Sequence, residues 1–583
     1  MSKKSVYVQK IPFNEDSVKK FRKDIIESGG LTEKYFLNYP IVYIAKHNNK
    51  EKYLVYVGES SDIVKRTLQH LIVDSKERDD WKALAESSDS EMYIIGHELF
   101  NKSLTLDIEN RLMLYLSSVD DIECVYNRRT NQQNEYYTSE HLDKVFSGIW
   151  RTLRRYDKKL FPLETIIRDS AIFKASPFHK LTIEQSDAIS QIKVKIIEAL
   201  KENQTGKLIF VSGAAGAGKT VLLSSLFYDI CHTIYDEEGE TIFDNLDNYL
   251  LVNHNQQLTI YQQIAVKLNL MNSNKVTKPT SFINDYNINM ADVVLIDEAH
   301  LLWTQGKQSY RGKNQLLDIL NKAKVVVAVF DEDQILATNQ IWEKSLKEKI
   351  VDEFNPEIIY LNNQLRIQSS LETHRWIRNI IDHQIINNIP DDSNYEIKIF
   401  EHPKDLEIAI REKASDVENG ISRIISTFDW EYNGNRKPET QDYWMVEEDD
   451  WSMPWNLQLK ESDRIQKKKN NQLSWGEMPH TINEVGSTYT VQGLDLNYAG
   501  LIIGPSVKYR DGKVIFDPNE SKNKNAIQNR MMSDGTKMKH GETLLKNELN
   551  VLITRGVHGL YIYAVDKELR EALLKARKGI LDE

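Results

Sequence analysis

The chain has 583 residues, more than one hydrophobic core normally organises, so its length predicts two to four domains. Hydrophobic residues make up 40% and charged residues 28% of it, which excludes a disordered or fibrous protein. The net charge of -11 excludes a uniformly basic nucleic-acid wrapper, although a motor needs only a locally positive channel.

Targeting and redox signals are absent from the sequence. No run approaches the roughly 18 consecutive apolar residues of a membrane-spanning helix, and the first twenty residues lack the apolar core of a secretory signal. Cys124 and Cys231 are the only cysteines, too few for a disulfide framework or a thiolate metal site. We therefore expect a cytoplasmic protein without membrane contact, whose metal ions are bound by oxygen atoms.

Short β-rich runs and two helical segments fill residues 1–150. IVYIA at 41–45 and LVYVG at 54–58 are predicted strands, joined by a polar loop at 46–51. Helices are expected at about 62–72 and 105–116, with a strand at 91–96 between them. The pattern predicts a small α+β domain.

Two tyrosines lie thirteen positions apart on the first two of these strands, and the second is followed closely by a glycine. The region 38–130 resembles the GIY-YIG nuclease signature, although Ile41 stands where that family has glycine. The matching residues, in chain order, are Tyr43, Tyr56, Gly58, Arg66, His70, Glu109 and Asn127.

The resemblance implies metal-dependent cleavage of a phosphodiester bond. Glu109 would bind Mg²⁺ or Mn²⁺, and Arg66 would stabilise the charged phosphate. A tyrosine, Tyr43 in preference to Tyr56, would help to activate water with assistance from His70. The alternative is a degenerate domain that grips nucleic acid without cutting it.

Residues 151–180 show neither a helical nor a strand period, and we expect them to be a connector. The basic run RTLRRYDKK at 151–159 and the lysines at 467–469 are either nucleic-acid contacts or solvated surface. From residue 207 onward, apolar runs alternate with helical stretches: LIFVSG, NYLLVNHN, DVVLIDEAH and KVVVAVFDEDQ. Because such runs are typical of a buried parallel sheet, we expect an α/β fold with ligands at the carboxyl ends of the strands.

Residues 213–220, GAAGAGKT, match the phosphate-loop pattern GxxxxGK[ST] between a predicted strand and a predicted helix. Gly213, Gly216 and Gly218 permit a loop whose N–H groups wrap phosphate oxygens. Lys219 would reach the outer phosphates and Thr220 would hold Mg²⁺. The sequence therefore predicts that ATP and Mg²⁺ are the cofactors.

Two carboxylates, Asp297 and Glu298, end the apolar strand VVLID. Asp297 is predicted to hold Mg²⁺, directly or through water. Glu298 is predicted to be the general base for the hydrolytic water.

From the phosphate loop onward, the motifs resemble those of superfamily 1 helicases, and within them the bacterial Schlafen-like helicases, over about residues 178–566. The resemblance implies two RecA-like P-loop NTPase lobes with parallel sheets, at 181–365 and 366–583, preceded by the α+β domain. The residues it singles out are Gln185 for adenine, 251–258 for nucleic acid, Gln334 as sensor of the γ-phosphate, Arg366 toward the phosphates, Thr490, Gln492, Gly493 and Asp495 in a T-x-Q-G-x-D motif near the nucleotide, and Arg555 as arginine finger.

Five tryptophans lie in the second predicted lobe between residues 428 and 475, where the periodicity is poor. Their rings either pack an irregular insert or stack on bases. This segment is Trp430, Trp444, Trp451, Trp455 and Trp475 with their polar surroundings.

We expect the chain to couple ATP hydrolysis to movement on nucleic acid, DNA in preference to RNA, while its nuclease domain cuts what the motor engages. A role in defence against invading DNA rests only on analogy with similar domain fusions. Two alternatives stay open: a nucleotide-gated sensor that does not unwind, and an RNA-directed nuclease-ATPase. Protein partners and homo-oligomers also stay open.

Overall fold

The computed structural model describes residues 6–49, 52–126, 136–213, 216–231, 243, 246–270, 275–306, 310–362, 367–416, 420–461, 463, 466–467, 470 and 473–581. Arg366 and Asn127, both singled out in the sequence, lie outside these residues. The chain divides into two compact units. The first is Met1–Thr182, Ser224–Asp244 and Tyr261–Asn274, and the second is Ile183–Leu223, Asn245–Ile260 and Lys275–Glu583.

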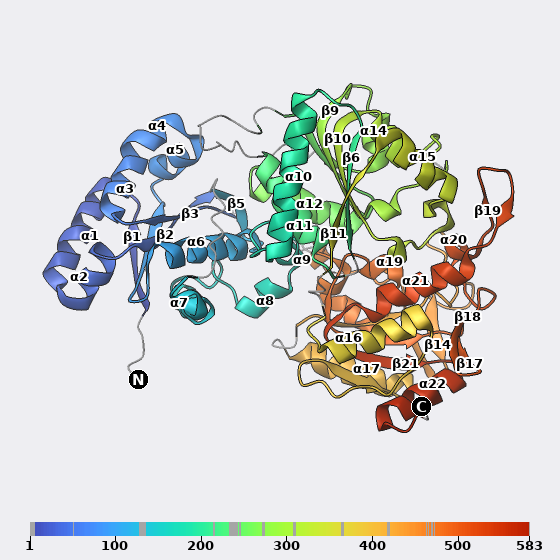
Figure 1. Ribbon diagram of the computed structural model, residues 1–583. Coiled ribbons are helices and arrows are strands. Elements are labelled where there is room, and N and C mark those ends of the chain that lie inside the picture. Colours follow the sequence, from blue (N-terminus) through green and yellow to red (C-terminus); the bar gives the residue numbers. More distant parts are fainter. Residues whose placement is uncertain are drawn as a thin grey trace. The chain divides into compact units, whose positions relative to one another are not determined.

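The first unit is built on a mixed five-stranded sheet with strand order β1-β4-β2-β3-β5 (Figure 1). The strands are β1 Val6–Pro12, β2 Ile41–Asn49, β3 Lys52–Ser60, β4 Glu91–His97 and β5 Ile122–Tyr126. Only β3 and β5 are parallel neighbours. Because β2 and β3 stay paired out to Asn49 and Lys52, most of the loop predicted at 46–51 is strand.

Helices cover both faces of this sheet. They are α1 Glu15–Ser28, α2 Gly30–Leu37, α3 Ile63–Gln69, the π-helix His70–Asp74, α4 Ser75–Glu77, α5 Asp79–Glu86, α6 Lys102–Ser117, the 3₁₀ turn Ser139–His141, α7 Leu142–Tyr156, α8 Glu164–Asp169 and α9 Ala171–Lys174. One apolar core joins α1, α2, α3 and α5 to the sheet; its members include Phe21 of α1, Phe36 of α2, Trp81 of α5 and Tyr43 of β2. The predicted α+β arrangement of strands and helices is present.

The expectation that residues 151–180 lack a helical period is wrong. The segment holds the end of α7 and all of α8 and α9. The buried face of α7 begins at Val145 and continues through Ile149 and Leu153, so its helical period crosses residue 150. A sequence window that starts at residue 151 contains only the charged C-terminal end of that helix.

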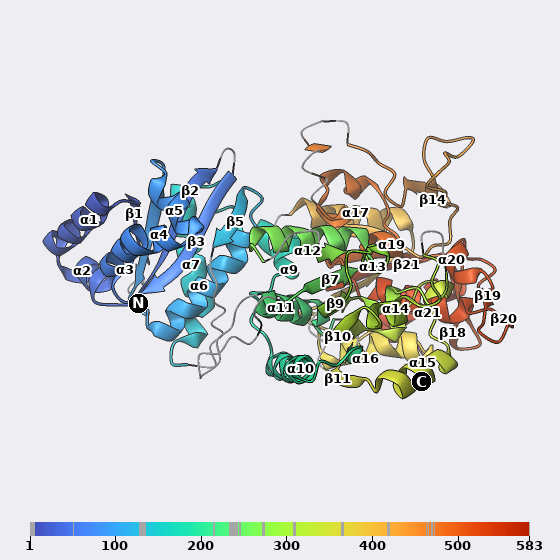
Figure 2. The same ribbon diagram turned by 90° about the horizontal axis from the view of Figure 1, so that it is seen from above.

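The second unit contains two parallel sheets. The first has strand order β11-β6-β10-β9-β7-β8, from β6 Lys207–Gly213, β7 Asn248–Val252, β8 Val276–Thr277, β9 Ala291–Asp297, β10 Ala323–Phe330 and β11 Glu357–Leu361. Its central strands are continuous apolar runs because helices cover both faces. α10 lies on one side, and α14 and α15 lie on the other (Figures 1 and 2).

The helices of this lobe are α10 Ile183–Lys201, α11 Lys219–Cys231, α12 Asn255–Lys267, α13 Pro279–Asn284, α14 Gln315–Leu320 and α15 Lys344–Phe354, with 3₁₀ turns at Ala299–Leu301, Glu332–Gln334 and Thr338–Gln340. α11 and α12 begin in the second unit, and their later turns are grouped with the first.

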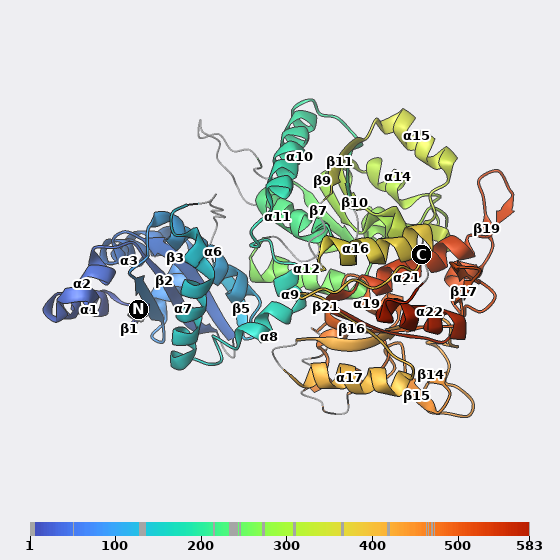
Figure 3. The same cartoon turned by 60° about the horizontal axis from the view of Figure 1, so that its bottom comes forward.

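The second sheet has strand order β12-β21-β16-β13, from β12 Glu396–Ile399, β13 Ser422–Ser426, β16 Leu496–Ile503 and β21 Gly556–Ala564. α17 Pro403–Ser415 packs on one face, and α21 Gly541–Ile553 and α22 Lys567–Lys578 pack on the other (Figure 3). The remaining elements are α16 Leu371–Arg378, the π-helix Asn379–His383, α19 Thr488–Val491, α20 Lys524–Ile527, 3₁₀ turns at Trp475–Glu477 and Pro479–Asn483, and the hairpins β14 Met445–Glu448 with β15 Trp451–Pro454, β17 Val507–Arg510 with β18 Lys513–Phe516, and β19 Arg530–Met531 with β20 Lys537–Met538. Two parallel sheets confirm the predicted α/β class.

The tryptophans between residues 428 and 475 pack the insert. Trp451, Trp455 and Trp475 are buried, and Trp430 and Trp444 are half-buried. The indole N–H groups of four of them, Trp430, Trp444, Trp451 and Trp455, donate to protein oxygens, as in Trp451 to Glu407 at 2.7 Å. Separately, none of the helices in the described ranges combines the length and apolarity needed to cross a bilayer.

A candidate nucleotide site and a candidate nuclease site

The phosphate loop begins where β6 ends, and its described glycines are required by the backbone. A Cβ on Gly213 would lie 2.7 Å from the carbonyl oxygen of Leu361 on the neighbouring strand. Gly216 and Gly218 have φ of +87° and +74°, the left-handed region that residues with a Cβ avoid. The described part of the loop therefore holds a conformation in which its backbone can approach a ligand closely.

Lys219 opens α11 directly after this loop and is buried. Its Nζ lies 3.0 Å from Oδ2 of Asp331 and donates to the carbonyl of Gly213. The same Asp331 oxygen accepts a 2.6 Å bond from Nε2 of Gln334. Burial favours protonation of Asp331, but Lys219 and the other polar neighbours outweigh it and lower the pKa of the carboxyl.

Asp331 is a site residue that the sequence did not single out. It follows β10, and β10 lies between β6, which leads into the phosphate loop, and β9, which ends in the acidic pair. The strand order that brings Asp331 to Lys219 is a property of the tertiary structure and is not visible in the sequence. A carboxylate at the end of a buried strand, three residues before Gln334, was the available signal.

The acidic pair lies at the carboxyl end of β9, as predicted. Asp297 is 1% exposed and accepts a 2.6 Å bond from Nε2 of Gln257. Glu298 has φ 50° and ψ 50°, an uncommon conformation for a residue other than glycine and one that is concentrated at functional sites. Its Oε2 lies 3.2 Å from Nε2 of His300, whose pKa is lowered by burial, so this histidine is neutral at pH 7.

The second sheet's lobe reaches the same place through the motif at 484–496. Gly493 has φ +78°, and a Cβ there would lie 3.2 Å from Oε1 of Gln257. Gln492 beside it is 4% exposed, and among the described residues its Nε2 has no hydrogen-bond partner. Gln257 thus lies between the acidic pair of one lobe and the glycine of the other.

Two further predicted residues lie at this candidate site. Gln185 donates from Nε2 to the carbonyl of Gly218 at 3.2 Å, which places it against the phosphate loop. Arg555 is 1% exposed and donates to the carbonyls of Val551, at 2.9 Å, and Leu494, at 3.2 Å. Burial is the main cause that lowers the pKa of His300, and the positive charge of Arg555 lowers it further, while these two hydrogen bonds hold Arg555 in its own lobe.

Hydrogen bonds connect the lobes beside the Gln334 turn. Asn547 donates to the carbonyl of Ile335 at 3.0 Å, and Asn550 donates to that of Asp333 at 3.2 Å. Both asparagines lie on α21, the helix that ends just before Arg555. An ion pair between the buried Arg530 and the half-buried Glu343 joins the lobes nearby, with Nη2 of Arg530 3.0 Å from Oε1 of Glu343.

This donor set fits a magnesium-bound nucleoside triphosphate. It offers loop N–H groups, the Lys219 ammonium, the Thr220 hydroxyl at the start of α11, and two buried carboxylates. The part of the chain that the structure describes contains no group of three or more His, Cys, Asp or Glu side chains able to hold a metal by themselves. Mg²⁺ does not need one, because it is usually held by one or two protein oxygens, phosphates and water.

In the first unit, Tyr43 and Gly58 face each other across β2 and β3. A Cβ on Gly58 would lie 2.5 Å from Oη and 2.6 Å from Cζ of Tyr43. The ring of Tyr43 is 1% exposed and therefore occupies the space that the glycine leaves. Ile41, where a glycine was expected, is a buried member of the same core.

A hydrogen-bonded chain runs from Tyr43 through His70 to Asp74. Tyr43 Oη lies 2.8 Å from His70 Nε2, and His70 Nδ1 lies 2.5 Å from Asp74 Oδ2. Burial, followed by the charge of Arg66, lowers the pKa of His70 to about 4 despite the opposing effect of Asp74. The imidazole is therefore neutral at pH 7: Nδ1–H donates to Asp74, and Nε2 accepts from Tyr43.

The other predicted nuclease residues surround this chain. The ring of Tyr56 is 6.1 Å from that of Tyr43, and Arg66 interacts with both tyrosines. Burial raises the pKa of Tyr56, and the carboxylate of Glu109, itself 6% exposed on α6, raises it further. The structure thus brings together Tyr43, Tyr56, Arg66, His70 and Glu109.

Sequence reasoning missed two neighbours of His70. Asp74 lies four residues further along and closes the π turn. Trp81 stacks on the imidazole at 3.5 Å between ring centroids and 13° between planes. The spacing of four was a usable signal for Asp74, whereas the stacking of Trp81 was not visible in the sequence.

Parallel sheets, a glycine-rich loop leading into Lys219 and a buried acidic pair define a P-loop nucleoside triphosphatase. The chain belongs to the Schlafen group 3 family, whose DNA/RNA helicase domain matches residues 206–566. This confirms the predicted helicase class and its use of ATP. An uncharacterized protein of Saccharomyces cerevisiae is 34% identical over 410 residues, which cover 64% of this chain and 84% of that relative.

Among solved structures, the chain is similar to one from a study of two coordinating Pif1 helicases that unwind forked double-stranded DNA. The sequence identity is 13%, the match covers 68% of this chain and 96% of the other, and the TM-score is 0.26.

Proposed function

We propose that this protein is an ATP-driven motor on nucleic acid, DNA in preference to RNA, and that its N-terminal unit is a metal-dependent nuclease that cuts the strand the motor engages. The nuclease proposal rests on the hydrogen-bonded chain Tyr43–His70–Asp74, with Arg66 and Glu109 beside it. It combines a proton acceptor, a cation for the phosphate and a carboxylate for a metal in one place.

We assign proton transfer in the nuclease to the hydrogen-bonded residues Tyr43, His70 and Asp74. Asp74 fixes the His70 tautomer that keeps Nε2 free to accept, as in other carboxylate–histidine pairs. When the Tyr43 hydroxyl takes a proton from water, it passes its own proton to His70 Nε2. Arg66 stabilises the charge on the phosphate. Glu109 would hold Mg²⁺ or Mn²⁺, which when bound supplies further charge neutralisation.

In the motor, Lys219 would exchange the Asp331 carboxylate for phosphate oxygens, and Thr220 and Asp297 would hold Mg²⁺. Glu298 is the proposed general base. Because Asp331 also holds Gln334, and the Gln334 turn is bonded to α21, a change at the phosphates is transmitted to the helix that leads to Arg555.

The test uses the full chain with labelled single-stranded and duplex DNA and RNA, Mg²⁺, and ATP present or absent. Glu109→Gln should abolish cleavage and keep ATP hydrolysis. Lys219→Ala should abolish ATP hydrolysis and keep the cleavage of single strands. Glu86→Gln, the same substitution at an exposed site in α5, should match the wild type.

Three results would count against the proposal. Absence of cleavage on every substrate would refute the nuclease proposal. ATP hydrolysis that no nucleic acid stimulates favours the nucleotide-gated sensor. Cleavage of RNA alone transfers the preference from DNA to RNA.

A further inference from the structure

A hollow of about 310 Å³ lies in the second unit between the first turn of α12 and the insert that follows β15. From α12 it is lined by Asn255, Gln256, Thr259 and Ile260, and from the insert chiefly by Leu457, Leu459, Leu473 and Met478. Lys460, Glu461 and Lys467 also line it. Apolar side chains, amides, two ammonium groups and one carboxylate thus meet in one place.

The backbone at the edge of this hollow is strained. Asn456 and Leu457 have φ of 67° and 62°, two consecutive left-handed residues that are not glycine. Asparagine tolerates this region, whereas a branched side chain such as leucine does so only at a cost. Leu457 is 45% exposed, so burial of its side chain does not explain why leucine occupies this strained position.

Buried groups hold the strained turn in place. The carboxylate of Glu484, fully buried, accepts the N–H of Gln458 at 3.0 Å and that of Leu459 at 3.2 Å. Oδ1 of Asn456 accepts a 2.7 Å bond from Ser487. The turn is therefore a built feature that presents Leu457, and strain of this kind is concentrated at functional sites.

The opposite wall of the hollow is connected to the nucleotide site. Within α12 and the residue before it, Gln257 bonds Asp297 at 2.6 Å, and His254 bonds the carbonyl of Tyr489 at 3.1 Å. Gln256 accepts the N–H of Trp475 at 3.4 Å, which ties the wall to the insert. A ligand in the hollow would thus contact the helix turn that touches the acidic pair.

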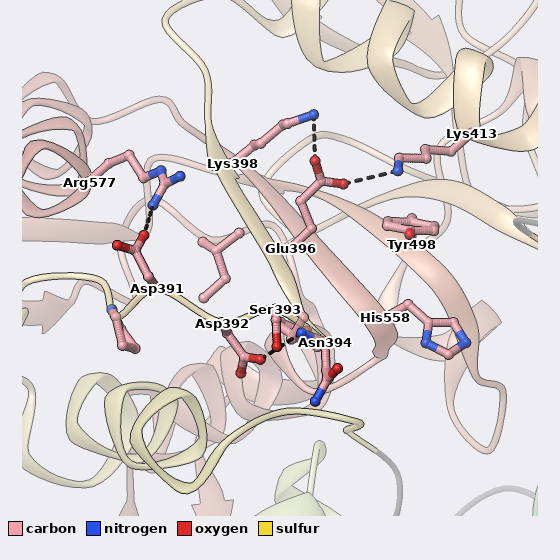
Figure 4. A pocket seen from close by; sticks show the side chains of 13 residues that line it. Asp391, Asp392, Ser393, Asn394, Glu396, Lys398, Lys413, Tyr498, His558 and Arg577 are labelled. Atoms are coloured by element: carbon pink, nitrogen blue, oxygen red, sulfur yellow. Dashed lines mark hydrogen bonds and ion pairs between the residues drawn. The ribbon is translucent and has the colours of Figure 1, made fainter.

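A larger hollow, of about 430 Å³, lies beside β12 but is chemically less suited to nucleic acid (Figure 4). Its cations are already paired within the protein. Glu396 holds Lys398 at 2.7 Å and Lys413 at 3.0 Å, and Asp391 faces Arg577 at 3.5 Å. These pairs leave little charge for phosphate.

We propose that the hollow beside α12 binds one base of a single strand held by the motor, with the Leu457 side chain against the face of the base. This site rests on the proposed action on nucleic acid. The apolar residues suit the face of a base, Asn255 and Gln256 offer donors and acceptors to its edge, and Lys460 and Lys467 suit the flanking phosphates. The volume is at the lower limit of ligand pockets and suits a single nucleotide.

The test scans one abasic position at a time along a labelled single strand, in a DNA series and an RNA series, and measures affinity for the full-length protein. In the wild type, one position should lose affinity by about fivefold or more, because the apolar face of that base is no longer buried against Leu457. All other positions should change less. In Leu457→Gly the sensitive position should disappear and affinity for the intact strand should fall to a similar extent.

Leu457→Gly removes the side chain and relieves the strained φ, so thermal stability should not fall. Asp449→Gly is the matched control, because Asp449 also has a positive φ, of 50°, in the exposed turn between β14 and β15. It should keep the wild-type abasic profile. Tight binding with a flat wild-type profile, or an unchanged profile in Leu457→Gly, overturns this site alone, whereas no binding to any strand overturns the proposed function as well.

Discussion

Gly58→Ala tests whether the glycine of the nuclease signature is required for its steric fit to Tyr43. The added Cβ would lie 2.5 Å from Oη and 2.6 Å from Cζ of that ring. Ordinary contacts start near 3.4 Å, so the ring must move by roughly 1 Å, and it is 1% exposed within a packed core. Overpacking of this kind costs about 1–3 kcal/mol of the free energy of unfolding.

The same shift should break the 2.8 Å bond from Tyr43 to His70. We expect cleavage by Gly58→Ala to fall by about 100-fold, the lower range for loss of acid–base catalysis, while ATP hydrolysis stays unchanged. Chemical denaturation and a cleavage assay measure the two effects. Gly148→Ala is the control, because its Cβ would meet only Val6, at 3.3 Å, and should leave cleavage unchanged.

A double-mutant cycle isolates the contact. In the Tyr43→Ala background the ring is gone, so Gly58→Ala should no longer destabilise the unit, and the coupling between the two sites should be about 1–3 kcal/mol. Wild-type cleavage and stability in Gly58→Ala, or additive effects in the cycle, would show that the reasoning from this contact is wrong.

Three further predictions concern charge. Arg530→Ala leaves the half-buried Glu343 without its cation and should cost about 1.5–3 kcal/mol in denaturant unfolding, the range for a hydrogen bond to a charged group, with Arg530→Lys in between. Equal stability of all three would contradict the interlobe pairing. Lys219→Ala should lower ATP hydrolysis by at least about 100-fold in a phosphate-release assay, and retention of turnover would contradict the assignment. Because the folded-state pKa of His70, about 4, lies below its ordinary 6.5, its neutral form persists in acid and cleavage should stay level from pH 7.5 to about pH 5.5. The same shift means that the unfolded chain binds more protons in that window, so His70 contributes a loss of stability as the pH falls from 6.5 toward 4; a cleavage midpoint near 6.5 would contradict the assignment.

Much of the motor site was predictable because its chemistry is local in sequence. The glycines around Lys219 and the carboxylates after β9 occur in short motifs, and apolar runs placed those motifs at strand ends. The same holds for the nuclease tyrosines on β2 and β3. The roles proposed for these residues stay predictions until variants are measured.

What the sequence did not show depends on packing between distant segments. Asp331 reaches Lys219 only because β10 lies beside β6, and Gln257 reaches Asp297 from a motif expected to contact nucleic acid. The helices at 151–180 were missed because the apolar face of α7 begins before residue 150. Periodicity within a window carries no information on such neighbours.

The left-handed turn at Asn456 and Leu457 has a consequence for engineering. Each strained residue of this kind costs on the order of 1–3 kcal/mol, a noticeable part of the roughly 5–15 kcal/mol that keeps a domain folded. A screen that rewards heat resistance alone should therefore select glycine at position 457. If the turn contacts a base, the variants recovered would be more stable and would bind the single strand with lower affinity.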